Sequence, residues 1–494
     1  MNSKKLIEAR AYEQEKIKEV DETLRPEFHA AVPVGWMNDP NGFSVFNKEC
    51  HLFYQYHPYT TEWGPMHWGH FKTTDFVKWE RMPIALAPDE IFDSAGCFSG
   101  SALEYKGEHI LVYTGVIEEK DETGKKRVQQ VQCIASGDGK EYKKWNCNPI
   151  ITSNSLPEGV YEQDFRDPKI WKHEDTFYLV VASRSEDESG QIVLYKSKDL
   201  REWLFIKILA RSNNQYGKMW ECPDFFVLQD KYILITSPQE MMARGMEFHN
   251  GNNVIYMSGV FDYKTCEFTQ EYIRSIDYGL DFYAPQTMES QDGRRIMIAW
   301  MKSWDANINP GHLKWNGMMT FPRELELQGT ELIQKPVKEI EKYYSDSVEF
   351  HNHVLSGTTQ LEGISGRELD IQIEIIEGQY QKFEMQLAHN DIYTTKCSYI
   401  PKDGTFTFDR TYSGLNRDVS CIRTMRIPER SESITIRILL DKYSAEIFIN
   451  GGRQVMSNVF YTPLEAQDIL FDVNGELVAN IVKHKISVSE CVPV

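Results

Sequence analysis

The sequence predicts an all-β protein, a five-bladed β-propeller followed by a C-terminal β-sandwich. After about residue 30, short β-branched and aromatic runs alternate with polar turns, which is typical of strands and hairpins. A pair of strands joined by a charged turn then recurs five times before about residue 300. Four strands in each repeat, arranged radially, are typical of a propeller whose blades surround a central channel.

The five repeats differ in sequence but share one order of features. Each has a first strand, a turn containing Lys, Asp or Gly, and a more apolar second strand that ends in a small or polar residue. A third strand, a polar turn and a fourth strand follow in several of them. The repeated hairpins are GFSVFNKECHLFYQYH (42–57), GSALEYKGEHILVYTG (100–115), DPKIWKHEDTFYLVVAS (167–183), CPDFFVLQDKYILITS (222–237) and APQTMESQDGRRIMIAWM (284–301).

A proline begins the first strand of four repeats, after Asp39, Asp167, Cys222 and Ala284. Proline is tolerated at the start of a strand and pushes the residue before it into an extended conformation. We therefore expect these four residues to be extended and to occupy equivalent places. If the first strand of each blade lines the channel, they gather at one of its mouths. Glu221 lies one residue upstream of Cys222, so three carboxylates are predicted to converge there.

The residues on either side of the repeats predict three further segments. Residues 1–24 are charged, with sparse apolar positions, and predict a polar surface helix as an N-terminal extension. The propeller is expected over residues 25–334. Residues 335–346 predict a linker with a short helix. Residues 347–494 show alternating strands separated by Gly, Asp and Asn turns, which predict a β-sandwich of ordinary domain size.

The charge of the chain excludes some partners. There are 73 acidic and 54 basic residues, for a formal net charge of −19, which repels nucleic acid and anionic membranes. A local Arg or Lys pocket can still bind one phosphate group on a small substrate. We expect a small-molecule substrate, no nucleic-acid partner and no membrane partner. The sequence does not indicate an oligomeric state.

The cysteines favour a reducing compartment. The nine are scattered, odd in number and never spaced as CxxC, so neither a disulfide framework nor a zinc ribbon is indicated. The N-terminus lacks an apolar signal region, and no run approaches the roughly 18 apolar residues that span a bilayer. We therefore expect a cytoplasmic protein without metal or cofactor. His67 and His70, three residues apart in a strand, point to opposite faces rather than to one zinc ion.

The three carboxylates suit glycoside hydrolysis with retention, which needs a nucleophile and an acid/base about 5–5.5 Å apart. Asp39 lies in GWMNDPNGF, whose Trp and Asn can keep it ionised, although Asp-Pro-Asn-Gly also suits a plain type I turn. The apolar flank of Glu221, Trp220 and Cys222, is expected to raise its pKa for proton transfer. Asp167 follows Arg166 and should remain charged, binding sugar hydroxyls and stabilising the transition state.

The motifs WMNDPNG, GPMHWGH, CFSGSA, FRDPK, WECPD and DFYAPQT, in that order, resemble those of glycoside hydrolase family 32, the β-fructofuranosidases. The resemblance runs from about Arg25 to Leu325 and continues more weakly through DRTYSG and SAEIFING. It implies a five-bladed propeller with a β-sandwich. It also implies Asp39 as nucleophile, Glu221 as acid/base, and Asp167 with Arg166 as the pair that binds fructose hydroxyls.

The same resemblance implies a set of residues that line the fructose pocket. Cys222 lacks a histidine partner in a suitable context, and is expected to pack there rather than to act as a nucleophile. The pocket residues are Asn38, Gln55, Trp63, Phe98 and Ser99, with Trp36, Cys222, Tyr283 and Trp304 as further wall residues.

The implied reaction is retaining hydrolysis of sucrose and related fructosides, including sucrose 6-phosphate and short fructo-oligosaccharides. Three alternatives remain: a dedicated sucrose-6-phosphate hydrolase, a non-catalytic sugar-binding propeller, and an inverting enzyme with carboxyls about 6.5–9.5 Å apart. A phosphate would need cations at the outer rim. The segment IEEKDETGKKRVQQ carries Lys120, Lys125, Lys126 and Arg127, although a solvated hairpin tip explains this cluster as well.

Overall fold

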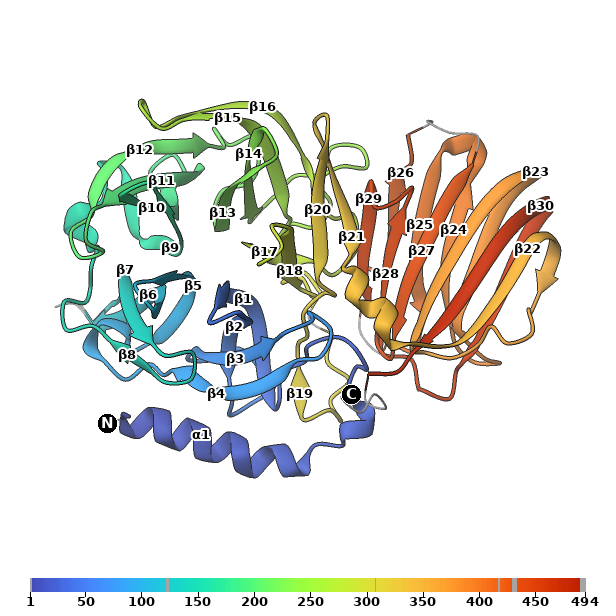
Figure 1. Cartoon of the computed structure of the whole chain (residues 1–494), viewed down its shortest axis with the longest axis horizontal. Coiled ribbons are helices and arrows are strands. Elements are labelled where there is room, and N and C mark those ends of the chain that lie inside the picture. The colour runs from blue at the N-terminus through green and yellow to red at the C-terminus, as the bar shows by residue number, and fades with distance from the viewer. Residues whose placement is uncertain (1, 121–123, 307, 416–417, 429–432, 489–494) are drawn as a thin grey trace.

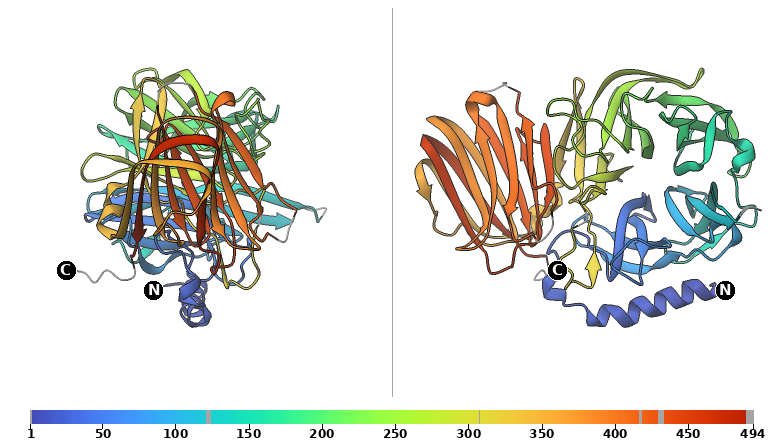
Figure 2. Two further views of the ribbon diagram at one scale, coloured as in Figure 1. Left: turned by 90° about the vertical axis from the view of Figure 1, so that its right-hand side faces the viewer. Right: turned by 180° about the vertical axis from the view of Figure 1, so that it is seen from behind.

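A computed structural model describes residues 2–120, 124–306, 308–415, 418–428 and 433–488. Figure 1 shows a propeller standing beside a separate stack of strands, and Figure 2 shows the same arrangement from the side and from behind. The predicted fold class is confirmed: in the described residues the strands form a five-bladed β-propeller and a C-terminal β-sandwich. No helix in these residues is long and apolar enough to cross a membrane.

The blades are antiparallel sheets whose first strands, β1, β5, β9, β13 and β17, surround the centre of the ring (Figure 1). The first two blades contain β1 (Gly35–Phe46), β2 (Glu49–His57), β3 (His67–Thr73), β4 (Glu80–Leu86), then β5 (Gly96–Tyr105), β6 (Glu108–Lys120), β7 (Lys126–Gly137) and β8 (Tyr142–Lys144). The next two contain β9 (Val160–His173), β10 (Thr176–Ser185), β11 (Gly190–Ser197), β12 (Leu204–Arg211), then β13 (Trp220–Leu228), β14 (Lys231–Pro238), β15 (Ile255–Asp262) and β16 (Glu267–Ser275).

The last blade also closes the ring. It contains β17 (Tyr283–Glu289), β18 (Arg295–Trp300), β20 (Arg323–Gln328) and β21 (Glu331–Pro336). Between β18 and β20 the chain crosses to the first blade, where β19 (Trp315–Asn316) pairs in parallel with β1 through Gly35 and Trp36. This parallel pairing joins residues nearly 300 positions apart, and no local sequence pattern predicts it.

The N-terminal segment is helical and lies along the outside of the first blade (Figures 1 and 2). Helix α1 (Lys4–Lys16) begins at Ser3, whose hydroxyl accepts from the backbone N–H of Leu6. Leu6 and Ala9 are its buried residues, and Arg10 donates to the carbonyl of Ile84 in β4. Two short 3-10 helices, η1 (Ile17–Glu19) and η2 (Glu22–Leu24), follow. The helix is therefore a polar surface element, held by two small apolar contacts and by several side-chain hydrogen bonds, among them those of Lys5 and Arg10.

The sandwich is built around two long strands, β23 and β30, which pair with each other along most of their length. The first half of β23 pairs with β27 and its second half with β24, so one strand contributes to both layers. The 3-10 helix η5 (Lys338–Tyr343) leads into it. Its strands are β22 (Tyr344–Thr359), β23 (Leu369–His389), β24 (Thr394–Ile400), β25 (Thr405–Tyr412), β26 (Ile422–Arg426), β27 (Ile434–Asp441), β28 (Ser444–Ile449), β29 (Gln454–Val459) and β30 (Asp468–Ile486). Three further 3-10 helices lie in loops, η3 (Ile91–Asp93), η4 (Ser153–Ser155) and η6 (Pro401–Asp403).

Buried charges join the propeller to the sandwich. The His29 ring lies 2.7 Å from Asp441 and 2.9 Å from Glu446, both on sandwich strands. Arg323 of β20 donates to Glu446 and, at 3.0 Å, to Asp277. All five side chains are buried, so each charge depends on its partners for solvation.

Candidate active site

Every inner strand of the propeller breaks its pairing register at the same level. In β1, Asn38 and Asp39 together face Gln55, which is a β-bulge. The proline that follows has no N–H to donate to the ladder, which favours a bulge at this point in four blades. The other breaks occur at Ser99, at Asp167–Pro168, at Cys222–Pro223 and at Ala284–Pro285.

The backbone at these bulges corrects one expectation. Asp167, Cys222 and Ala284 do not have the extended conformation predicted for a residue before proline; their φ angles are +64°, +50° and +51°. A left-handed conformation costs a residue other than glycine of order 1–3 kcal/mol and persists only where surrounding contacts hold it. Bulges of this kind change the direction in which a side chain points. Here they direct the carboxylate of Asp167 and the thiol of Cys222 toward side chains of other blades.

The bulges arrange the side chains in two levels. We call one residue from each bulge, taken together, the bulge ring, and the residues that directly precede these five in sequence the outer ring. The bulge ring consists of Asp39, Ser99, Asp167, Cys222 and Ala284, and the outer ring consists of Asn38, Phe98, Arg166, Glu221 and Tyr283.

Within the bulge ring, two carboxylates share hydrogen-bond donors. The Ser99 hydroxyl lies 2.7 Å from Oδ2 of Asp39. The Cys222 thiol lies 3.5 Å from Oδ2 of Asp39 and 3.5 Å from Oδ2 of Asp167, and the Cys222 backbone N–H donates to Asp167 at 2.9 Å. One sulfur thus bridges two carboxylates that are 128 positions apart in the sequence.

Within the outer ring, Glu221 is held from both sides. Arg166 approaches Oε1 of Glu221 at 2.9 Å through Nε and 2.8 Å through Nη2. The Tyr283 hydroxyl lies 2.5 Å from Oε2 of Glu221 and 3.2 Å from the carbonyl of Ser237. Asn38 connects the rings, because its amide donates to Oδ1 of Asp39 at 3.0 Å.

The electrostatics of this cluster favour the uptake of a proton. Burial raises the pKa of Asp39, the charge of Glu221 raises it further, and hydrogen bonds from Asn38 and Ser99 oppose the rise. Burial also raises the pKa of Asp167, against the opposing charge of Arg166. The carboxyls of Asp39 and Asp167 thus share this nearly buried site with the single guanidinium of Arg166. The arrangement suits chemistry that needs one protonated and one ionised carboxyl.

The surroundings of Glu221 differ from the prediction. Trp220 precedes it in a strand, so its ring points to the opposite face, where Nε1 donates to the carbonyl of Tyr216. The side chain of Glu221 therefore contacts Arg166 and Tyr283 instead of an apolar flank. Cys222 is more than a packing residue, because burial and the nearby carboxylates raise the pKa of its thiol, which stays protonated as a donor.

Aromatic side chains lie on two sides of the rings. Trp36 stacks on Trp304 with ring centres 6.0 Å apart, and its Nε1 donates to Asn38 at 2.8 Å. Trp63 meets Phe98 edge to face at 6.0 Å. Trp63 is 50% exposed and Trp304 37% exposed, so both side chains are partly open to solvent. Gln55 is buried behind the rings and donates to the carbonyl of Cys97 at 3.0 Å.

Two residues that support Arg166 were missed from the sequence. Asp164 accepts from Arg166 at 3.1 Å and pairs with Arg184 at 2.7 Å, and Gln130 accepts from Arg166 at 3.3 Å. Asp164 stands three residues before Asp167 in QDFRDPK, which was the available signal. Gln130 belongs to the neighbouring blade, and no local pattern connects it to Arg166.

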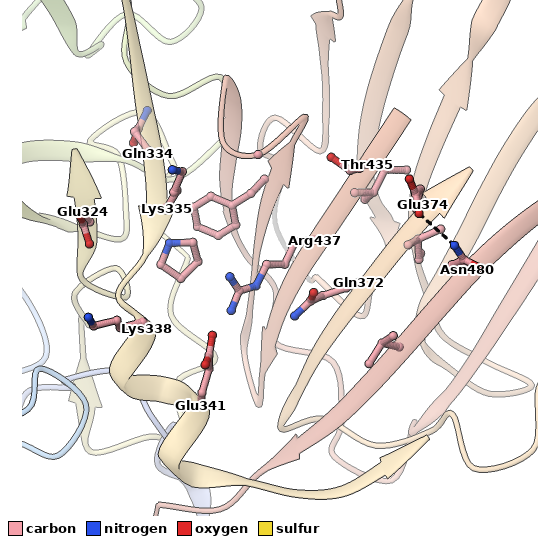
Figure 3. Close-up of a pocket in the computed structure, with 16 residues that line it drawn as sticks. Glu324, Gln334, Lys335, Lys338, Glu341, Gln372, Glu374, Thr435, Arg437 and Asn480 are labelled. Carbon is pink, nitrogen blue, oxygen red and sulfur yellow. Dashed lines mark hydrogen bonds between the residues drawn. The ribbon is translucent and has the colours of Figure 1, made fainter. Parts of the chain in front are cut away.

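Other features lie apart from the rings. His67 contacts the carbonyl of Pro65, whereas His70 contacts the ring of His51. Within the described ranges, no three His, Cys, Asp or Glu side chains form a group that could hold a metal ion. A cavity of about 630 Å³ lies at the seam between β20–β21 and the sandwich, where Lys338, Glu341 and Arg437 line it (Figure 3). No residue of either ring lines this cavity.

Comparison with known families finds two matching models. Residues 29–336 match the glycosyl hydrolases family 32 N-terminal domain, and residues 337–489 match the glycosyl hydrolases family 32 C-terminal domain. Together they cover most of the chain.

Known proteins of similar sequence and structure agree with these models. A sucrose-6-phosphate hydrolase of Escherichia coli is 37% identical over 450 residues, which are 90% of this chain and 91% of that protein. A raffinose invertase of Escherichia coli is 34% identical and covers 92% and 94% of the two chains. The structure of a GH32 β-fructofuranosidase of Bombyx mori superposes with a TM-score of 0.85, at 32% identity and 99% coverage of both chains.

Proposed function

This chain belongs to glycosyl hydrolase family 32, and on that premise we propose that it hydrolyses the β-fructofuranosyl bond of sucrose and related fructosides with retention of configuration. It is a glycoside hydrolase of the invertase type. The observation that carries the proposal is the pair of rings, which hold Asp39 and Glu221 in one nearly buried cluster with different partners. A sugar-binding propeller without catalysis would have no use for two such unlike carboxyls.

We assign the nucleophile to Asp39. Three donors meet its carboxylate, from Asn38, Ser99 and Cys222, and fix its orientation. In the first step Asp39 attacks the anomeric carbon of the fructosyl group, and the bond from that carbon to the glycosidic oxygen breaks. Fructose is then esterified to Asp39, and the bonding electrons remain on the leaving oxygen.

We assign the acid/base to Glu221. Its proton passes to the glycosidic oxygen as that bond breaks, so glucose leaves neutral. In the second step Glu221 takes a proton from water, whose oxygen attacks the same carbon and releases fructose from Asp39. The two displacements restore the starting protonation of both residues and retain the configuration of the sugar.

The remaining ring residues support the sugar. Asp167 and Arg166 are proposed to bind fructose hydroxyls, with Asp167 stabilising the positive charge that develops at the anomeric centre. Trp36, Asn38, Gln55, Trp63, Phe98, Ser99, Cys222, Tyr283 and Trp304 form the proposed pocket. The exposed faces of Trp63 and Trp304 are available to the leaving group.

We propose that sucrose and sucrose 6-phosphate are both substrates. Arg127, near the turn of the basic β6–β7 hairpin, pairs with Glu162 at 2.7 and 2.9 Å, and Glu162 lies at the start of β9. Lys126 pairs with Glu118 at 2.6 Å. The hairpin thus approaches the blade that carries Asp167, but carboxylates offset two of its cations, so we infer only a modest preference for phosphate. Part of the segment, residues 121–123, lies outside the described residues.

A dedicated sucrose-6-phosphate hydrolase is the second candidate, because several similar proteins carry that name. The deciding experiment measures kcat/KM of the purified protein on sucrose, sucrose 6-phosphate, kestose and inulin. Our proposal expects turnover of both sucrose and its phosphate. Activity on the phosphate alone would favour the second candidate, and no activity on any fructoside would contradict the proposed function.

We also propose a cytoplasmic location. The eight cysteines in the described part of the chain are free thiols, a state that a reducing compartment maintains.

A further inference from the structure

The segment before Tyr283 is held by the edge of the sandwich, although Tyr283 itself belongs to the active site. We propose that the Asp281–Arg410 pair, which joins this segment to the sandwich, positions Tyr283 and through it the acid/base Glu221. The sandwich would then be part of the support of the catalytic centre. This inference rests on the proposed role of Glu221.

Strand β29 is the edge strand of the sandwich sheet and lies on the side that faces the propeller (Figure 1). Its backbone groups bond to residues 277–281, which link β16 to β17. The Tyr278 N–H donates to Val455 at 2.8 Å, the Asp281 N–H donates to Ser457 at 3.0 Å, and the Ser457 N–H donates to Asp277 at 2.9 Å. The linking segment therefore satisfies backbone groups that an exposed edge would leave unpaired.

Two residues of the segment fit the sandwich closely. A Cβ atom on Gly279 would lie 2.1 Å from the carbonyl oxygen of Ser457, so no larger residue fits without a backbone shift. Leu280 is 1% exposed and packs in the same apolar core as the sandwich residues Ile447 and Met456. The propeller segment contributes the side chain of Leu280 to the sandwich core, so the packing of the two domains is interdependent at this contact.

Asp281 is fixed at the end of the segment by two sandwich groups. Arg410 donates to its Oδ2 at 2.6 Å and the Val459 N–H donates to the same oxygen at 2.8 Å. Both charged side chains are buried. Arg410 is the arginine of the DRTYSG motif, which the proposed chemistry does not otherwise use. Because water does not screen this pair, the ionic bond holds its partners firmly.

The restraint on Asp281 reaches the acid/base Glu221 through the next two residues of the chain. Phe282 is 4% exposed and lies under Arg323, 5.2 Å from ring centre to guanidinium. Tyr283 follows, and its hydroxyl lies 2.5 Å from Glu221. A segment clamped at Asp281 and packed at Phe282 leaves Tyr283 little freedom, so Glu221 receives a hydrogen bond of fixed direction. Asp281 and Arg410 touch no reacting atom and are positioning residues.

The test begins with Arg410→Met and a matched control, Arg437→Met. Arg437 also forms an ion pair with a buried carboxylate, that of Asp370 at 2.6 Å, but its own side chain is 25% exposed, both residues lie within the sandwich, and Arg437 faces the seam cavity (Figure 3). We expect Arg410→Met to lower kcat on sucrose by about ten- to a hundredfold, since small misplacements of a reacting group have effects of this size. KM should change less. The control should keep the wild-type kcat, even where its thermal stability falls by a similar amount.

A second substrate separates positioning of the acid from general loosening. p-Nitrophenyl β-fructofuranoside has a leaving group that needs no proton, so it depends little on the acid function of Glu221. The quantity to compare is the rate constant for formation of the fructosyl-enzyme from this substrate. We expect Arg410→Met to retain most of the wild-type value. We also expect its loss on sucrose to overlap with that of Tyr283→Phe, so that the double variant is slower than Tyr283→Phe alone by no more than about twofold.

Three results would overturn the inference: wild-type kcat of Arg410→Met on sucrose, equal losses on both substrates, or losses that multiply in the double variant. If Arg410→Met does not fold, Asp281→Asn replaces it in the same comparison, with the same expected and contrary results. The proposed function fails separately, if the wild-type protein does not hydrolyse fructosides or if Glu221→Ala keeps full activity. An active wild type with an unaffected Arg410→Met would refute the positioning role alone.

Discussion

The thiol of Cys222 lies 3.5 Å from the carboxylate of Asp39. It lies at the same distance from Asp167, and burial raises its pKa so that it remains a donor. A cysteine in this position stabilises carboxylate charge instead of attacking the substrate. Its chemistry therefore depends on its proton, which gives it a testable role.

Replacing Cys222 by alanine should make the enzyme slower at acidic pH. The ionised carboxylates lose a donor worth about 1 kcal/mol, so the acidic limb of kcat/KM against pH should move to higher pH, with a loss of about fivefold on that limb. Cys222→Ser keeps a donor and is the control. An unchanged pH profile for Cys222→Ala would contradict this role. The wild-type enzyme should also resist inactivation by iodoacetamide, because a buried, protonated thiol is a poor nucleophile.

Removal of each proposed catalytic carboxyl should have a different consequence. Asp39→Ala should have no measurable turnover on any fructoside, because no fructosyl-enzyme can form. Glu221→Ala should lose about 10²–10⁴-fold in kcat on sucrose, the usual contribution of a general acid. Added azide should restore part of the turnover when the substrate has a good leaving group. Glu162→Gln, which changes a carboxylate near the start of β9 that contacts neither ring, is the control, and wild-type activity of Glu221→Ala would show that another group is the acid.

The buried link at His29 should make stability depend on pH. Burial alone would lower the pKa of His29, but hydrogen bonds and charges of Asp441 and Glu446 raise it from 6.5 to about 9. Because the folded pKa exceeds the unfolded one, this stabilisation is fully present below about pH 6.5 and is lost as the pH rises through about 9. His29→Gln should therefore cost on the order of 3 kcal/mol at pH 6. Scanning calorimetry from pH 5.5 to 9.5 should show a fall in Tm for the wild type that the variant lacks.

An exposed histidine provides the control for that experiment. The side chain of His351 is 65% exposed, so His351→Gln should leave both Tm and its pH dependence unchanged. A His29→Gln variant whose Tm falls in parallel with the wild type between pH 6.5 and 9 would show that His29 is not the titrating group.

A substrate phosphate should gain only a small advantage from Arg127. An exposed cation that is already paired contributes little, so Arg127→Gln should lower kcat/KM for sucrose 6-phosphate by no more than about fivefold and leave sucrose unchanged. Raising the salt concentration should reduce the wild-type preference for the phosphate in the same way. Arg201→Gln is the control, because Arg201 is an exposed arginine that stacks on Trp145. Equal effects of Arg127→Gln on both substrates would refute a contact with the phosphate.

The number of blades and the gathering of the carboxylates could be predicted from local patterns. Proline after Asp39 and Asp167 marks the same point of two blades, and radial repetition brings equivalent points together. The left-handed backbone at Asp167 could not be predicted from this, because the residue before proline is extended by local preference. The bulge that overrides the preference depends on pairing with β10, which is a tertiary contact.

The partners of Glu221 could also not be predicted from the sequence. Neighbours in a strand point to opposite faces, so the apolar residue next to Glu221 in sequence, Trp220, is not its neighbour in space. The neighbours of Glu221 in space are Arg166 and Tyr283, which come from the blades on either side. The contact of Asp281 with Arg410 spans 129 positions and two domains, and only the assembled fold reveals it.

The central claim is that Asp39 carries the fructosyl group during turnover. The most direct measurement traps that state in Glu221→Ala, which forms the intermediate from an activated fructoside but hydrolyses it slowly. The reaction is quenched in acid, the protein is digested, and the masses of its peptides are measured by mass spectrometry. We expect one added fructosyl group on the peptide that contains Asp39, and none when Asp39 is also replaced by alanine. A fructosyl group on any other residue, or turnover of the activated substrate without a covalent intermediate, would contradict it.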